Sequence, residues 1–273
     1  MKKKASFSRN LLYIVLIVYA IITLLPFVWA LTSSFKTLGE ISSGAMSLIP
    51  HHFTFDNYAK IFTIEKYFPR WLFNSAFIAI VGTLLNLLFN SMCGYALARL
   101  SFPGKKSLFI IILAVLMIPM QVTLIPTYLI LSSMGWLNTY QGIIVPGMIN
   151  ASFIFMMRQF FINFPAELEE AAAIDGLGRF GTFFRIVLPL AKPALAAQAI
   201  FVFMGFWNDF MRPLIIMSDQ SMYTLTLGLN SFKGQHVTYW NYIMAASMIS
   251  TVPILALYAA FNRFFIKGLS FTG

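Results

Sequence analysis

The stretch "EEAAAIDGLGRFGTFFRIVLP", from Glu169 to Pro189, is a polar insert in a chain that is otherwise strongly apolar. Acids, bases and glycines gather here, whereas long apolar runs lie on both sides of it. Hydrophobic residues make up 59% of the 273 residues, and charged residues only 10%. A soluble domain usually has about 45–50% apolar and about 25% charged residues, so the composition predicts an integral membrane protein.

The formal net charge of +10 does not point to nucleic acid as a partner. Lys and Arg occur in short clusters between apolar runs, which is the pattern of cytoplasmic membrane loops. The single cysteine, Cys93, lies within an apolar run, so neither an intrachain disulfide nor a cysteine metal site is expected. His51, His52 and His236 lack a partner motif such as H-E-x-x-H, and we therefore predict no metal site and no enzyme active site.

Six apolar segments are long enough to be membrane spans, because about 20 residues cross a hydrocarbon core of about 30 Å. We expect a single all-α membrane domain over residues 1–273, with spans at about 11–31, 72–97, 108–131, 142–161, 194–217 and 242–261. Gly142, Pro146, Gly147 and Asn150 dilute the first half of the fourth span. The first run is too long and too rich in bulky residues for a cleaved signal peptide.

The distribution of charge predicts the orientation of these spans. If the N-terminus is cytoplasmic, 13 of the 19 Lys and Arg residues fall in inner segments, as the positive-inside rule requires. Trp29, Trp71, Trp136 and Trp240 then fall at the outer boundary, where amphipathic rings prefer the headgroup level. Both termini and the loop 163–193 are therefore expected in the cytoplasm.

Within that loop, "NFPAELEEAAAIDG" (163–176) predicts a short helix. Asn163 can cap it, Pro165 suits its first position, and Asp175-Gly176 supplies a stop. Its first turns hold three acids that complement the positive end of a helix: Glu167, Glu169 and Glu170. The helix could dock on a partner or merely lie on the headgroups; the acids favour docking, because helices that lie on a membrane are typically basic.

Seven residues at fixed spacing fit the pattern E-A-A-x3-G-x9-I-x-L-P: Glu170, Ala171, Ala172, Gly176, Ile186, Leu188 and Pro189. This pattern resembles that of the permease subunits of binding-protein-dependent ABC importers, which have the type I importer fold. In that family the helix before the glycine, the coupling helix, docks in a cleft of the ATPase. We assign the same ATPase-coupling role to Glu167, Glu169 and Asp175 on this predicted helix. "ARLSFPGKK" (98–106), "FWNDFMRPLIIMSD" (206–219) and "YTLTLGLNSFKGQ" (223–235) are similar to the MalG-like carbohydrate-uptake subclass.

The resemblance implies partners that supply what this chain lacks. "GKKS" at Gly104–Ser107 ends like a P-loop, but Arg99 stands where the first glycine is required, so ATP and Mg are expected on the partner and no cofactor on this chain. The expected partners are a cytoplasmic ABC ATPase dimer, a second permease (a non-identical MalF-like chain), an extracytoplasmic sugar-binding lipoprotein or periplasmic protein, and the lipid bilayer. The expected location is the bacterial cytoplasmic membrane, and the chain by itself is expected not to be an enzyme.

Polar residues inside the spans are candidates for the substrate pathway: Asn86, Asn90, Gln121, Trp207, Asn208, Asp209 and Arg212. For the stripe Gly82, Asn86, Asn90 and Gly94, helix packing is the favoured interpretation and pore lining the alternative. Asp209 and Arg212, i and i+3 on a helix, could also simply neutralise each other. Pro119 and Pro126 are expected to bend the third span. Five residues of an outer loop are candidates for contact with the binding protein: Asn230, Phe232, Lys233, Gly234 and Gln235. The outer segment 32–71 is a second candidate.

The function that follows is uptake of a sugar, expected to be an oligosaccharide, through a pathway of which this chain forms half. Glycerol-3-phosphate or another small solute is the alternative within the same importer class. A stand-alone secondary transporter or channel is more remote, because it would need several buried acids for ion coupling and only Asp209 is available.

Overall fold

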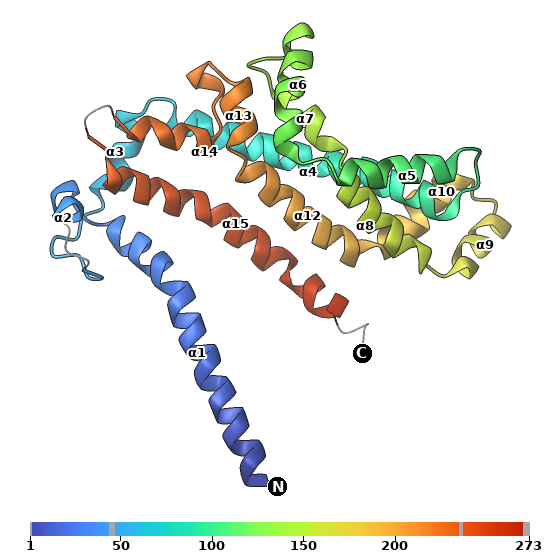
Figure 1. Cartoon of the computed structure of the whole chain (residues 1–273), viewed down its shortest axis with the longest axis horizontal. Coiled ribbons are helices and arrows are strands. Elements are labelled where there is room, and N and C mark those ends of the chain that lie inside the picture. Colours follow the sequence, from blue (N-terminus) through green and yellow to red (C-terminus); the bar gives the residue numbers. More distant parts are fainter. Residues whose placement is uncertain (1, 44–46, 235–236, 270–273) are drawn as a thin grey trace. The chain divides into compact units, whose positions relative to one another are not determined.

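The computed structural model describes residues 2–43, 47–234 and 237–269. Regular structure in these residues is helical, apart from an isolated antiparallel bridge between Lys233 and Thr238, which confirms the all-α prediction. The chain forms two compact units, one made of Met1–Phe68 and Leu229–Val252, the other of Pro69–Gly228 and Pro253–Gly273. Figure 1 labels the helices of both.

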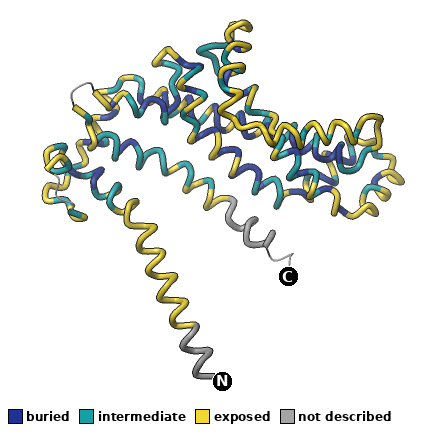
Figure 2. The backbone as a smooth tube through the Cα atoms, in the orientation of Figure 1, coloured by how far each residue is buried: buried dark blue, intermediate teal, exposed yellow. Residues whose placement is uncertain are grey.

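The first unit holds α1 (Lys2–Ser33), α2 (Leu38–Ser42), α3 (Asp56–Ile64), a 3₁₀ turn (Leu229–Phe232) and the start of α15 (Trp240–Leu269). The apolar stretch Arg9–Ser33 has a mean hydropathy of 2.7, and 0% of its most apolar window is buried. Figure 2 shows α1 exposed along most of its described length. A helix of this length and exposure is suited to face lipid or another chain.

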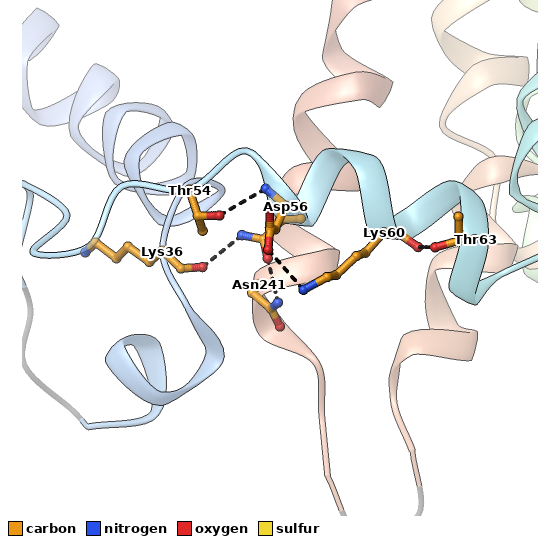
Figure 3. A network of polar contacts seen from close by, with 7 residues as sticks. Lys36, Thr54, Asp56, Lys60, Thr63 and Asn241 are labelled. Carbon is orange, nitrogen blue, oxygen red and sulfur yellow. Dashed lines mark hydrogen bonds and ion pairs between the residues drawn. The ribbon is translucent and has the colours of Figure 1, made fainter.

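A network of amides holds the rest of the first unit together (Figure 3). The buried Asn57 of α3 donates from Nδ2 to the carbonyl oxygens of Ser34 and Lys36, at 2.8 Å each. Asn241, in the first turn of α15, donates to Asn57 Oδ1 at 2.8 Å. These bonds join the loop after α1, helix α3 and the start of α15, which are far apart in sequence.

Glu40 of α2 holds the loop that follows it. Its carboxylate accepts from the backbone N–H groups of His51, at 2.9 Å, and of His52, at 3.5 Å. The bond from His51 is the main reason that the pKa of Glu40 lies below its usual value of 4.5. The aromatic rings of Phe35 and Phe53 stack 4.7 Å apart within the same unit.

The second unit holds the remaining elements. They are α4 (Phe68–Arg99), α5 (Lys105–Leu116), α6 (Met120–Ser133), α7 (Tyr140–Met148), α8 (Ala151–Ile162), α9 (Ala166–Ile174), α10 (Arg179–Thr182), a π-helical turn (Phe183–Val187), α11 (Leu188–Leu190), α12 (Lys192–Trp207), α13 (Met211–Ile216), a 3₁₀ turn (Gln220–Met222) and α14 (Leu225–Gly228). One buried cluster joins α4, α8 and the π-helical turn, through Tyr95, Met157, Phe161 and Phe183.

Three of the predicted spans are interrupted. The span expected at 108–131 is the pair α5 and α6, bent by 105° at Met117–Pro119. The span expected at 142–161 is α7 and α8, which are separated by Ile149 and Asn150. Counted together, α7 and α8 still form one stretch, Tyr140–Ile162, that is long and apolar enough to cross a membrane. With Arg9–Ser33, Phe68–Arg99 and Trp240–Ala260 it gives four such stretches in the described residues, or up to six if each of two bent pairs is one span.

The prediction of one helix over 194–217 is wrong. Helix α12 ends at Trp207, and the chain turns through Asn208 before α13 begins at Met211. Asp209 therefore lies in a turn and does not share a helical stripe with Gly205. The bent pair here is Arg179–Leu190 with Lys192–Trp207, at 79°.

Candidate functional site

Helix α9 is the short polar helix that the sequence predicts. The prediction that Asn163 caps this helix is wrong, because Asn163 is the C-cap of α8. Pro165, predicted as the first helical residue, is instead the N-cap, and the helix begins at Ala166. At the other end Gly176 has a φ of +79°, as its predicted role as a stop requires. The N–H of Gly176 donates to Ala173 O at 3.0 Å, and that of Leu177 to Ala172 O at 2.9 Å. This pair of bonds is a Schellman motif, which ends the helix abruptly.

Only one face of α9 is covered by the rest of the second unit. Ala172 is 3% exposed, and Glu169, one turn earlier, is partly buried. The opposite face presents the exposed acids Glu167 and Glu170 beside Ile174, which is 87% exposed. A short, well-terminated helix that exposes both acids and a large apolar side chain is suited to dock on another protein.

The segment after α9 carries the second half of the sequence pattern. In the described structure Ile186 and Leu188 are half-buried, Val187 between them is fully buried, and Pro189 is exposed. Val187 belongs to the same buried cluster as Phe161 of α8. The segment that follows α9 is therefore seated on the same core as α8.

The residues of "GKKS" (104–107), which resemble the end of a P-loop, have a structural role at the start of α5. Gly104 has a φ of +82° and precedes α5, and Lys105 Nζ donates to the carbonyl oxygens of Ala98, at 3.2 Å, and Leu100, at 2.8 Å. The lysine thus binds the end of α4, and it does not point into a ring of backbone N–H groups of the kind that holds a phosphate.

A cavity of about 250 Å³ lies within the second unit. Its polar lining comes from α4, α6, the α7–α8 break and α13: Asn86, Thr123, Thr127, Asn150 and Arg212. Its aromatic lining is Phe153, Phe201 and Phe206. Of the residues predicted for the substrate pathway, Asn86 and Arg212 line this cavity; Asn90, Gln121, Trp207, Asn208 and Asp209 are not among its lining residues. The sequence interpretation missed Thr123 and Thr127, although their spacing of four already places them on one face of a helix.

The asparagines of α4 bind the broken backbone between α7 and α8. Asn86 Nδ2 donates to Gly147 O at 3.0 Å, and Asn90 Nδ2 donates to Met148 O at 2.9 Å. Asn90 Oδ1 accepts from the N–H of Asn150 at 2.8 Å. A helix break at membrane depth needs such partners, because no water is available there. The packing interpretation therefore describes Asn90, whereas Asn86 both packs and lines the cavity.

The polar pair at the end of α12 is also satisfied internally. Arg212 Nε donates to Asp209 Oδ2, which is the self-neutralising arrangement, and the guanidinium carbon lies 5.4 Å from the ring centre of Phe206. Trp207, a candidate for the substrate pathway, is 2% exposed and stacks on Phe203, with 5.5 Å between the ring centres. Its ring is therefore part of the packing in this structure.

The residues predicted to meet a binding protein belong to the first unit. Lys233 and Gly234 are exposed, and Asn230 is partly exposed. Phe232 is only 3% exposed and packs against Tyr242, 6.0 Å between ring centres, so it anchors the segment instead of presenting its ring. Gln235 lies outside the described residues.

Comparison with known proteins gives one consistent result. Residues 90–271 match the family described as "Binding-protein-dependent transport system inner membrane component". The chain is 36% identical over 256 residues to the arabinooligosaccharides transport system permease protein AraQ of Halalkalibacterium halodurans, covering 93% of this chain and 92% of that one. It is 38% identical over 255 residues to the diacetylchitobiose uptake system permease protein NgcG of Streptomyces coelicolor, covering 91% and 83%.

A solved structure gives the corresponding match in fold. It is a bacterial ABC transporter involved in the import of the acidic polysaccharide alginate, with a TM-score of 0.84 at 23% identity, over 95% of this chain and 97% of that chain. At this identity the likeness concerns the fold. The family match covers most of the chain, including α9 and every lining residue of the cavity except Asn86. This multi-pass membrane protein therefore belongs to the family of binding-protein-dependent transport system inner membrane components.

Proposed function

We propose that this chain is a permease subunit of an ATP-driven importer of the bacterial cytoplasmic membrane. It crosses the membrane six times with both termini inside, counting each bent pair of helices as one span. With a second, non-identical permease it encloses a pathway for a sugar, delivered from outside by a binding protein. It carries no ATP site of its own, and ATP is bound and hydrolysed by a separate cytoplasmic ATPase dimer.

The structure of helix α9, with its abrupt end and its exposed acidic face, gives the main support for this proposal. Its Schellman end at Gly176 and the burial of Ala172 on its covered face make it a well-defined, short helix. The exposed face, with Glu167, Glu170 and Ile174, is left for a partner. Because the spans before and after α9 are covalently joined to it, a movement of α9 acts on both.

The lining of the cavity supports a sugar as the cargo. A sugar ring has apolar C–H faces and a rim of hydroxyl groups, and the cavity offers aromatic rings together with the amides and hydroxyls of Asn86, Asn150, Thr123 and Thr127. The names of two relatives, for arabinooligosaccharides and for diacetylchitobiose, favour an oligosaccharide.

The charge of the lining favours an uncharged cargo over glycerol-3-phosphate. Arg212 is the only charged residue among the described residues that line the cavity, and it is paired with Asp209. A phosphate group would gain more from a cation that has no acidic partner.

The docking of an ATPase at α9 can be tested by site-directed crosslinking. Single cysteines placed along 166–174, in a Cys93→Ser background, should capture an ATP-hydrolysing subunit when the complete transporter is treated with a bifunctional maleimide. Asn230→Cys, which lies on the opposite side of the membrane in the proposed orientation, is the matched control and should capture none. Absence of capture from every position along α9 would refute the proposed docking.

The cargo can be identified through the binding protein that serves this permease. A thermal-shift screen of that protein against neutral oligosaccharides and glycerol-3-phosphate should give its largest stabilisation with an oligosaccharide. Uptake of the same compound into cells should then require this chain. Stabilisation by glycerol-3-phosphate alone would show that the alternative cargo is the correct one.

A further inference from the structure

Three other helices, α5, α8 and α9, contact the C-terminal end of α4 through basic side chains. Two of these side chains come from α5 and α8, and the third belongs to α4. The last carbonyl groups of a helix have no partner within it, and they form its negative end. Arg158 of α8 donates from Nε to Leu97 O at 3.4 Å. Lys105 of α5 donates to Ala98 O at 3.2 Å and to Leu100 O at 2.8 Å. The third contact is with α9 and is made by Arg99, the last residue of α4.

That third contact is the ion pair between Arg99 and Glu169. Arg99 Nε lies 3.0 Å from Glu169 Oε1 and 3.2 Å from Oε2. The two side chains are only 17% and 20% exposed, so the pair is less screened than a surface salt bridge. Glu169 is also the one glutamate of α9 that is not exposed, since Glu167 and Glu170 face outward. The pair therefore joins the covered face of α9 to α4.

Helix α4 runs without a break from its C-terminal end to the cavity. Asn86 lines the cavity and lies 13 positions before Arg99, which is about 20 Å along a helix at about 1.5 Å per residue. Two other helices also lead from α9 to the cavity. Helix α8 adjoins α9 through residues 163–165 and contributes Phe153 to the lining, and α12, after a 79° bend, contributes Phe201. The route along α4 differs from these because it depends on a side-chain contact with α9, which a single substitution can break.

We propose that Arg99 and Glu169 form a latch through which a movement of α9 is passed to α4 and along it to the cavity. This inference rests on the proposed docking of the ATPase at α9 and names the element that carries the movement from there. Both are positioning residues, since neither lines the cavity. The latch predicts that breaking the ion pair separates ATP hydrolysis from transport, and that restoring the pair in reversed order reconnects them.

The test uses the complete transporter in proteoliposomes and measures the number of ATP molecules hydrolysed for each solute molecule imported. Arg99→Gln should retain the ATPase on purification and raise this ratio at least about fivefold, the lower end of measured coupling between sites. The charge swap, Arg99→Glu with Glu169→Arg, should bring the ratio back to within about twofold of the original. Lys106→Gln is the matched control, because Lys106 is exposed, lies near the end of α4 and makes no ion pair among the described residues; it should leave the ratio unchanged.

A covalent version of the latch covers the case in which Arg99→Gln does not reach the membrane. Cysteines at 99 and 169, in a Cys93→Ser background, should give efficient transport when joined by a short cleavable crosslinker and a high ATP ratio after cleavage. An unchanged ratio in Arg99→Gln, or joined cysteines that do not restore transport, would overturn the latch while the unaltered transporter still works. Failure of the proposed function would be seen earlier, as an unaltered chain that retains no ATPase.

Discussion

At the scale of single residues, Gly176 shows how backbone geometry alone can define a functional element. A Cβ at this position would meet no atom within 4 Å, so space is not the constraint. The constraint is the φ of +79°, which costs an ordinary residue about 1–2 kcal/mol and a β-branched residue more, whereas asparagine tolerates it. The end of α9 therefore depends on a residue type that can adopt the left-handed conformation.

Two substitutions at this position separate backbone strain from bulk. Gly176→Val should leave the protein in the membrane and abolish or strongly reduce uptake, because the strained backbone displaces the end of α9. Gly176→Asn should retain more uptake than Gly176→Val, although the side chains of asparagine and valine are about the same size. The measurement is the uptake rate divided by the amount of protein in the membrane. Equal loss in both variants would show that the φ angle is not what matters here.

Asn90 supplies the partners that a broken helix needs inside a membrane protein. Asn90→Leu would leave the carbonyl of Met148 and the N–H of Asn150 unpaired, at a cost of about 1–3 kcal/mol for each group. The midpoint of thermal unfolding in detergent should fall accordingly. Asn163→Ala, at an exposed asparagine, should change stability by less than about 0.5 kcal/mol. A midpoint that is unchanged in Asn90→Leu would mean that another group takes over both bonds.

The sequence could identify Asn86 and Asn90 as unusual, because an amide inside a span must find a partner. It could not choose between packing and pore lining, since their partners Gly147 and Met148 lie 61 and 58 positions away. The same limit applies to Trp207. Its aromatic character was evident from the sequence, but its burial against the rest of the second unit depends on tertiary packing.

At the scale of elements, α4 and α8 approach each other through a glycine. A Cβ on Gly94 would lie 2.7 Å from Met157 Cβ and 2.9 Å from the backbone nitrogen of Arg158. Neither atom is the end of a flexible side chain, so the helices themselves would have to separate. Small residues permit such close packing in membranes, where no hydrophobic effect draws helices together.

Gly94→Ala should therefore destabilise the chain by about 1–3 kcal/mol, the usual cost of forcing extra atoms into a packed interior. Gly205→Ala is the matched comparison within α12. A Cβ there would meet no atom within 4 Å, and alanine favours a helix by about 1 kcal/mol, so stability should stay the same or rise. Thermal unfolding of both variants in one detergent provides the measurement. A greater loss in Gly205→Ala than in Gly94→Ala would contradict the packing described for α4 and α8.

The loop after α2 should respond to acid through Glu40. Its pKa in the folded chain is below the usual 4.5, so its stabilising effect is complete above that value and is lost as the pH falls through the folded pKa. The His51 amide, which donates to Glu40, should lose protection from hydrogen exchange as the pH falls below 4.5 and through the lowered pKa, once intrinsic rates are corrected. Glu40→Gln, which has no carboxylate, should show no such step. The charges that face Glu40 are Lys36 and His51.

Hydropathy located the long apolar stretches of this chain, because length and apolar character are summed over many residues. It did not locate their interruptions. Pro119, which was expected from the sequence to bend the third span, is the N-cap of α6 at the 105° bend. Asn150, one of the residues that dilute the fourth span, is the N-cap of α8. The turn at Asn208 carries no proline or glycine, and this is why one straight helix was expected from 194 to 217.

At the scale of the whole molecule, the proposed orientation places α9 and the segment around Lys233 on opposite sides of the membrane. Single cysteines can test this in a Cys93→Ser background. A membrane-impermeant maleimide should label Lys233→Cys in intact spheroplasts, and Ile174→Cys only after the membrane is opened; both positions are exposed. Labelling of Ile174→Cys from outside would reverse the orientation and remove the basis for an ATPase at α9.

The bare surface of α1 has a consequence for how this chain can vary. Its window of highest hydropathy has no buried residue, and bulky Leu, Ile, Val and Tyr side chains follow one another around it, with no ridge of small residues for a tightly fitting neighbour. A lipid-facing surface does not discriminate between apolar side chains, so Leu, Ile and Val are interchangeable at such positions. Exchange of one bulky apolar residue for another along this stretch should therefore change the stability of the chain by less than about 0.5 kcal/mol.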